Sequence, residues 1–276
     1  MYSAAMPLDL GQEFINISMD QSILRACDNN MIVGQPTISL EGFISLKLRD
    51  NIQIDIGVNN SIRVKCNNSL FVMDCSETVF GFIWENTKLF FDEMGNIHLE
   101  AGKRMAKLTS RGISFTSKHR CLVYLLDMSG CKTTTERFHW FNYENINQQF
   151  IKDNSALNEQ NKARALTNLL KSNYIDGKDQ VWEMSGIKIK QKRCGDVHIE
   201  KTYSKLNISL SVRGQWVKLL LPRMKVFMSK HKQKNNVEIV LPFKQQRISI
   251  ENDNFRCKNG SQRAGFDAND QVILDC

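Results

Sequence analysis

The sequence predicts a mainly β protein with two antiparallel β lobes, of the meander or sandwich type, joined by one amphipathic α-helix. Many short runs alternate apolar with polar residues, a pattern typical of half-buried strands. Clusters of Gly, Asn, Asp and Ser separate these runs at a spacing of about 8 to 12 residues, as they do in antiparallel sheets. One stretch near the middle of the chain has helical periodicity instead.

The first lobe is expected over residues 37–150, after an N-terminal extension, 1–36, that is partly irregular. Its strands carry apolar residues at every second position: Ile44, Leu46, Leu48, Ile52, Ile54, Ile56, Ile62 and Val64. Polar residues such as Ser45, Asp55 and Arg63 lie between them, so one face of the sheet should be buried and the other wet. The connecting segments are rich in Asn and Gly, which tolerate the positive φ of hairpin turns.

The connecting helix is expected within residues 151–176. Apolar residues follow helical spacing at Ala163, Leu166, Leu169, Leu170 and Tyr174. Asn154 or Ser155 would cap the first turn, and Gly177 follows the end of the pattern. Because the charge balance changes at the same point, we expect this helix to link the two lobes or to pack between them.

The second lobe is expected over residues 177–276, where the strand pattern resumes. One apolar face is formed by Leu206, Ile208, Leu210 and Val212, and the residues between them are polar or basic. Pro222 and Pro242 each follow an apolar run, as expected at strand ends, because proline cannot donate to a strand ladder.

An acid followed by Met-Ser-Gly occurs twice, at residues 127–130 and 183–186. Each copy follows an apolar run and leads into an alternating segment, and a looser version passes through Met94 and Gly95. Beyond one serine, nothing nucleophilic or metal-ligating recurs with the phrase. We therefore interpret it as a repeated hairpin turn and not as a reactive motif.

Positive charge is concentrated in the second half of the chain. Residues 1–150 hold 14 Lys and Arg against 16 Asp and Glu, a net charge of −2, and residues 151–276 hold 23 against 13, a net charge of +10. The two values sum to the +8 of the whole chain. Such an asymmetry is typical of proteins that bind nucleic acid, anionic lipid or an acidic protein.

Basic side chains of the second lobe are therefore candidate contacts to a nucleic acid or an acidic partner. These candidates are Lys188, Lys190, Lys192, Arg193, Lys201, Lys205, Arg213 and Lys218. The alternative is a solvated face that keeps the sheet soluble and discourages edge pairing. That alternative is favoured, because aromatic residues that could stack on bases are not interleaved with these lysines.

A second candidate site is the aromatic cluster just before the expected helix. Its residues are Phe138, Trp140, Phe141 and Tyr143. Large aromatic side chains concentrate in binding hot spots, so these residues are candidates for protein docking. The alternative, which is favoured, is burial where the first lobe meets the helix and the second lobe.

Motifs of enzymes and metal sites are absent from the sequence. It contains no phosphate-binding P-loop, no G-x-S-x-G, no kinase signature and no G-x-G-x-x-G. His119 and Cys121 would share one face of a strand, but neither a C-x-x-C pair nor H-E-x-x-H is present. We predict no catalytic residue, no metal site and no cofactor.

The chain has no apolar run near the roughly 20 residues of a spanning helix, and its start does not resemble a secretory signal. We therefore expect an intracellular protein, cytoplasmic or nuclear, whose eight cysteines are free and mostly buried thiols. The predicted function is a non-catalytic interaction or scaffold protein whose macromolecular partner is a protein. The alternative is a nucleic-acid-binding module that uses the basic face of the second lobe. A third hypothesis is an enzyme whose site is assembled from residues distant in sequence.

Overall fold

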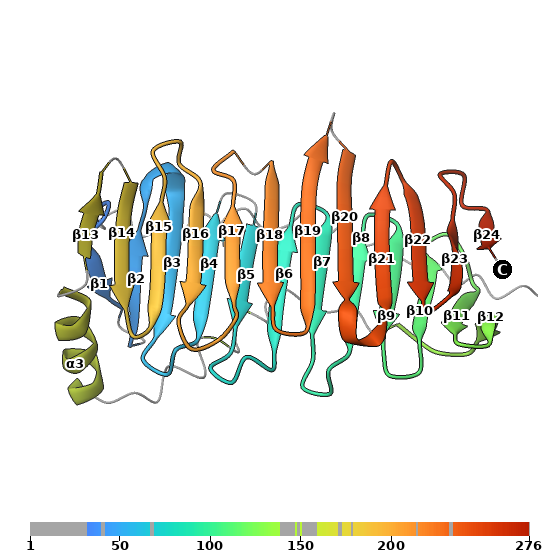
Figure 1. Ribbon diagram of the computed structural model, residues 1–276, viewed down its shortest axis with the longest axis horizontal. Coiled ribbons are helices and arrows are strands. Elements are labelled where there is room, and N and C mark those ends of the chain that lie inside the picture. Colours follow the sequence, from blue (N-terminus) through green and yellow to red (C-terminus); the bar gives the residue numbers. More distant parts are fainter. Residues whose placement is uncertain are drawn as a thin grey trace, which may run out of the picture.

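Two antiparallel sheets of 12 strands each form almost the whole described chain, with α3 (Glu159–Leu170) between them in sequence. The computed structural model describes residues 32–39, 42–66, 69–138, 147, 150, 159–170, 173–177, 179–213, 215–231 and 234–275. The sheets lie face to face (Figure 1), so the protein is a β-sandwich. The predicted fold class is confirmed. Most of the expected N-terminal extension, 1–36, lies outside the described residues.

Both sheets are simple meanders, in which each strand pairs with the next one along the chain. The first sheet comprises β1 (Pro36–Ile38), β2 (Phe43–Lys47), β3 (Ile52–Gly57), β4 (Ile62–Cys66), β5 (Ser69–Met73), β6 (Phe80–Trp84), β7 (Thr87–Phe91), β8 (Ile97–Ala101), β9 (Arg104–Leu108), β10 (Ile113–Ser117), β11 (Val123–Asp127) and β12 (Gly130–Thr134). The second sheet comprises β13 (Asn173–Asp176), β14 (Asp179–Met184), β15 (Ile187–Gln191), β16 (Val197–Lys201), β17 (Asn207–Leu210), β18 (Trp216–Leu221), β19 (Met224–His231), β20 (Lys234–Leu241), β21 (Gln246–Glu251), β22 (Asn254–Asn259), β23 (Gln262–Phe266) and β24 (Val272–Asp275).

The inner faces of the two sheets share one hydrophobic core. Ile54 and Phe115 of the first sheet belong to the same cluster of buried residues as Ile189 and Phe255 of the second. The ring centroids of Phe115 and Phe255 lie 5.6 Å apart across the sheets. Strand periodicity explains this arrangement, since every second side chain of a strand points to the same face.

The helix covers one end of the sandwich. α3 contacts β1, β2 and β14 (Figure 1), and it buries Ala165 and Leu169, whereas Leu166 is exposed. It joins the two sheets in sequence and contacts strands of both. The helix is also shorter than expected, because Tyr174 belongs to β13, which pairs with β14 through a turn at Gly177.

The outer face of the first sheet departs from the expected wet surface. Asp55 is fully buried and Arg63 nearly so, and they form an ion pair of 2.8 Å. Arg63 also donates to Asn147 at 2.9 Å, and its guanidinium lies over the ring of Phe150. The chain between β12 and α3 therefore contacts this face at Asn147 and Phe150. The expectation that Asp55 and Arg63 lie on an exposed face was wrong, because a distant segment packs there.

The repeated phrase does form hairpin turns, but the two copies turn at different points. Asp127 pairs with Gly130, so Met128 and Ser129 form the loop between β11 and β12. In the second copy Met184 pairs with Ile187, so the loop shifts to residues 185–186. Both of those loop residues have positive φ, as a type I′ hairpin turn requires. The phrase is thus a turn-forming composition and not one fixed structural unit.

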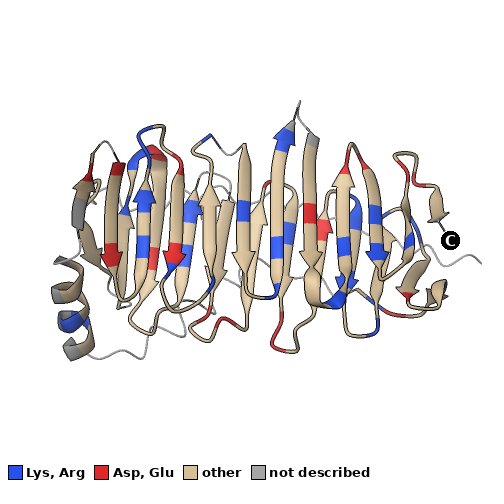
Figure 2. Cartoon of the chain, viewed as in Figure 1, with Lys and Arg blue, Asp and Glu red and all other residues tan. Residues whose placement is uncertain are grey.

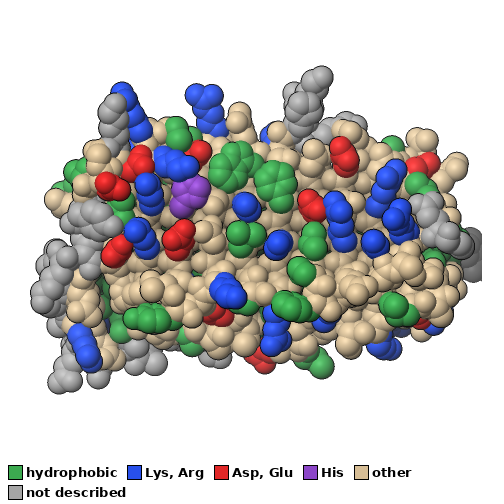
Figure 3. Space-filling model, viewed as in Figure 1, with side chains coloured by type: hydrophobic (Ala, Val, Ile, Leu, Met, Phe, Trp, Pro, Cys, Tyr) green, Lys and Arg blue, Asp and Glu red, His purple; other side chains and the backbone are tan. Residues whose placement is uncertain are grey.

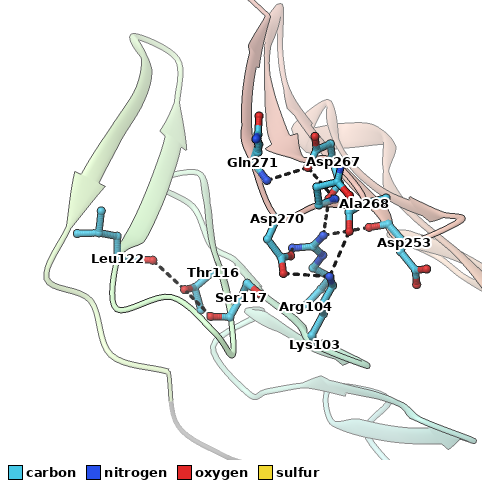
Figure 4. Close-up of polar contacts among 11 residues, drawn as sticks. Lys103, Arg104, Thr116, Ser117, Leu122, Asp253, Asp267, Ala268, Asp270 and Gln271 are labelled. Carbon is cyan, nitrogen blue, oxygen red and sulfur yellow. Dashed lines mark hydrogen bonds and ion pairs between the residues drawn. The ribbon is translucent and has the colours of Figure 1, made fainter.

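A buried cation joins the two sheets near the C-terminal end (Figure 4). Arg104 of β9 donates to the Asp270 carboxylate and to the carbonyl oxygens of Asp253 and Asp267. Lys103 lies 3.0 Å from the same carboxylate. Burial opposes ionisation of Asp270, but the two cations outweigh it and hold the pKa of this carboxyl below its ordinary value. These contacts link a strand of the first sheet to two loops of the second.

Candidate functional site

Along the strands of the second sheet, side chains point alternately to the buried face and to the outer face. In β15 the apolar residues Ile187 and Ile189 are buried, whereas Lys188 and Lys190 point outward and are half-buried. The pairing register continues this arrangement across the sheet. Figure 3 looks onto this face, where side chains of both charges and several apolar ones lie together.

The lysines of β15 are neutralised by neighbouring acids. Lys188 makes an ion pair of 3.2 Å with Glu183 and lies opposite Glu200 in the sheet. Lys190 makes an ion pair of 3.0 Å with Asp179. The hydrogen bond between them raises the pKa of Lys190 and lowers the pKa of Asp179. These lysines are exposed enough to meet a partner, but each already has a carboxylate beside it.

Lys201 differs from the other candidates because it lies at the interface of the two sheets. Its side chain is buried, and its ammonium lies 2.6 Å from Glu77, in the turn between β5 and β6. With Lys188 and Lys205 it lines a shallow depression of about 390 Å³ that also includes Glu200. Lys201 therefore ties the sheets together and is not part of an open basic surface.

The remaining candidates are dispersed over strands and turns. Lys192 and Arg193 lie in the turn between β15 and β16, Lys205 in the next turn, and Arg213 between β17 and β18; all four are exposed. Lys218 is exposed on β18, opposite Phe227 of β19, which is 42% exposed. The eight predicted residues thus do not form one continuous positive surface.

A denser cluster, which was not among the predicted residues, lies on β21, β22 and β23. We call it the β21–β23 basic cluster, and its residues are Arg247, Arg256, Lys258 and Arg263. Arg247 lies opposite Lys258, and Lys258 lies opposite Arg263. All four are exposed on the outer face. Figure 2 shows these bands of basic residues on β21 and β22 beside an acidic band on β20.

The charge of this cluster is poorly compensated. Glu238 of β20 makes an ion pair of 2.7 Å with Arg247. Among the described side chains, no carboxylate makes an ion pair with Arg256, Lys258 or Arg263. Like charges directly opposite one another destabilise an antiparallel sheet. In the first sheet, by contrast, Lys88 lies opposite an acid, Glu100, at 3.4 Å. Arg263 lies opposite Asp275 of β24, so Arg256 and Lys258 are the two cations of the cluster that have neither an ion pair with a described acid nor an acid directly opposite them.

The cluster surrounds a cavity of about 200 Å³ on the outer face. Its lining includes all four basic residues together with Ser249, Gly265 and Ile273. Gly265 lies opposite Arg256 and carries no side chain. A Cβ atom at that position would lie 2.0 Å from the Phe255 carbonyl oxygen, so the close approach of the two strands requires glycine.

The sequence did contain a signal for this cluster. Two-residue turns at 252–253 and 260–261 fix the register of β21, β22 and β23. Counting outward from each turn places Arg247, Lys258 and Arg263 in one row. The candidates drawn from the sequence instead followed the density of lysine nearer the helix.

The aromatic cluster is described in part. Phe138 is half-buried, and Trp140, Phe141 and Tyr143 lie outside the described residues. Farther along the same connection, Phe150 is buried against Phe43, with ring centroids 5.6 Å apart. The proposed docking role of this cluster stays a prediction.

The described histidines, cysteines and acids do not assemble a metal site. Within the described ranges no group of three or more lies close enough to hold a metal ion. Six cysteines are described as free thiols, but only Cys66 and Cys257 are buried, so the expectation that most are buried was wrong. Burial raises the pKa of Cys66 to about 11, outweighing a hydrogen bond with Ser69. No helix in the described part of the chain could cross a membrane.

No family model matches the chain, and no curated protein matches it. Among solved structures it is similar to the TCP10 domain of Danio rerio CPAP, with 8% identity and a TM-score of 0.24, over 88% of this chain and 99% of that one. It is also similar to the SAS-4 (dCPAP) TCP domain of Drosophila melanogaster, solved in complex with a proline-rich motif of Ana2. There the identity is 6% and the TM-score 0.22, over 80% of this chain and 97% of that one. At these TM-scores the similarity supports no argument, so function is argued from the residues of this chain.

Proposed function

We propose that the protein is a non-catalytic binding module whose partner is a protein with an acidic segment, which contacts the β21–β23 basic cluster. The row of Arg247, Lys258 and Arg263 supports this proposal, because Lys258 lies between two arginines and has no acid directly opposite it. Such a row destabilises the sheet on its own. Complementary charge on a partner would offset that cost and favour the correct orientation of binding. The non-catalytic part of the proposal comes from the sequence, which lacks reaction motifs.

The extent of the cluster favours a protein segment over a polynucleotide. Its positive charge is confined to three strands and is bordered by Glu238 on β20 and Asp275 on β24. Farther along the same face, Lys188 and Lys190 are already paired with carboxylates. A nucleic acid gains most affinity from a positive groove that follows many successive phosphates. A short acidic segment needs no such groove.

The test is a fluorescence-anisotropy titration of a labelled oligoglutamate peptide at physiological salt. We expect the R256E/K258E variant to bind at least about tenfold more weakly than the unmodified protein, since each lost charge contact contributes about 1 kcal/mol or more. The matched control is K188E/K190E, which reverses two charges on the same face. Those lysines already have acidic partners, so we expect the control to bind within about threefold of the unmodified protein.

Three results would overturn the proposal. Absence of peptide binding would remove the site altogether. Equal losses in the two variants would mean that net charge, and not the cluster, attracts the peptide. Oligothymidine and oligouridine of the same length are titrated in the same assay. Tighter binding of either, with the same dependence on Arg256 and Lys258, would establish the nucleic-acid alternative.

A further inference from the structure

The cavity inside the β21–β23 basic cluster has the features of a phosphate site. Arg247, Arg256 and Arg263 line it together with Lys258, and Ser249 contributes a hydroxyl. Three guanidinium groups at one cavity exceed what one carboxylate can use, since a carboxylate has two oxygens. A phosphoryl group has three terminal oxygens and a charge near −2, and each arginine can bind it through two parallel hydrogen bonds.

Gly265 is part of the cavity lining and carries no side chain. It lies beside Arg256 in the row formed by Ser249, Arg256 and Gly265, and the row of Arg247, Lys258 and Arg263 runs alongside. Any larger residue is excluded there, because its Cβ atom would meet the Phe255 carbonyl oxygen. The close approach of the strands therefore keeps this part of the cavity lining free of a side chain.

Glu238 supports one arginine of the cluster. Its carboxylate forms an ion pair of 2.7 Å with Arg247 from the neighbouring strand, which places an acid beside this guanidinium at the edge of the cavity. Such support is typical of groups held ready for a ligand. Arg256 lies opposite Ser249 and Gly265 and makes no ion pair with a described carboxylate, and Arg263 lines the same cavity opposite Asp275 of β24.

From these observations we infer that the cluster binds a phosphorylated side chain within the acidic segment of a partner protein. This inference rests on the proposed function and names the ligand class of the same site. The cavity opens on a broad sheet face and is not a closed pocket, so a phosphate carried by an extended chain can reach it with further contacts on either side. Recognition of phosphorylated segments by arginine clusters is a common mode of peptide binding.

Three labelled peptides with one acidic sequence and a central serine, glutamate or phosphoserine would test the inference. We expect the phosphoserine peptide to bind about tenfold or more tightly than the glutamate peptide, since it adds one to three charge-assisted hydrogen bonds. The R256K/R263K variant keeps both charges but loses the planar forks. It should abolish the preference for phosphoserine while leaving the affinity for the glutamate peptide nearly unchanged. R213K, in an exposed turn, is the matched control and should behave as the unmodified protein.

Each other outcome has a separate meaning. Equal affinities for phosphoserine and glutamate would overturn the phosphate inference and leave the acidic-segment proposal standing. Failure of all three peptides would overturn the proposed function itself. If inorganic phosphate displaced the phosphopeptide at an equal concentration, the peptide chain would contribute nothing, and the ligand would be free phosphate. A thermal midpoint unchanged in each variant shows that folding is preserved.

Discussion

The role of an individual charged residue in this protein depends on which residue lies opposite it, in the neighbouring strand or in the other sheet. Lys188 and Lys201 lie in neighbouring strands of one sheet, yet the first points outward to Glu183 and the second is buried beside Glu77. From the sequence, both lysines were equally good candidates for contacts to a nucleic acid or an acidic partner. Arg256 and Lys258 were not selected, although they have fewer acidic neighbours. Partner identity, and not local charge density, separates a structural lysine from one available for binding.

Arg104 provides the residue-scale prediction. Its side chain is 2% exposed, and it supplies hydrogen bonds to one carboxylate and two carbonyl oxygens of the opposite sheet. We expect R104M to lower the free energy of unfolding by about 1.5 to 3 kcal/mol, because the hydrogen bonds of a buried guanidinium to the opposite sheet are lost. Urea unfolding followed by circular dichroism measures this loss.

Lys103 is the matched control for Arg104. It contacts the same Asp270 carboxylate, but its side chain is 31% exposed. We expect K103M to cost only about 0 to 1 kcal/mol, as exposed ion pairs usually do. Equal losses in the two variants would show that burial of Arg104 adds nothing to the joint between the sheets.

At the scale of elements, turns and strand faces could be read from the sequence, and the helix only in part. The alternating runs became strands, and the repeated Met-Ser-Gly phrase lies at hairpins. The helix was predicted to extend as far as Tyr174, but this residue belongs to β13 and pairs with Val181 of β14. Tertiary pairing overrides local propensity at such an end.

Phe115 of β10 tests the packing between elements. It is fully buried and contacts Phe255 and Phe266 of the second sheet. We expect F115A to lower the free energy of unfolding by about 3 to 5 kcal/mol through lost burial and a residual cavity. F243A removes the same side chain at an 83% exposed position and should stay within about 0.5 kcal/mol. A similar cost for both variants, measured by urea unfolding, would contradict the packing described for Phe115.

At the scale of the whole molecule, the shared core predicts that the two sheets unfold together. Trp84 of the first sheet and Trp182 of the second are both 2% exposed and belong to the same hydrophobic cluster. In proteins that keep only one of these tryptophans, we expect the fluorescence transition in urea to coincide with the loss of circular dichroism. The expected lobes at 37–150 and 177–276 stay a prediction about domains. Separate transitions for the two reporters would mean that each sheet folds as a unit of its own.

The sequence by itself determined the antiparallel β class, the buried face of most strands, the places of the hairpin turns and the excess of positive charge in the second half. These properties are local, because a period of two and a turn residue act on neighbouring positions. Only the tertiary structure decided that the meanders stack into one sandwich, that Phe150 and Asn147 cover part of the first sheet, and that Glu77 neutralises Lys201. Those contacts join residues far apart in the chain, and their formation depends on how two complete faces fit together.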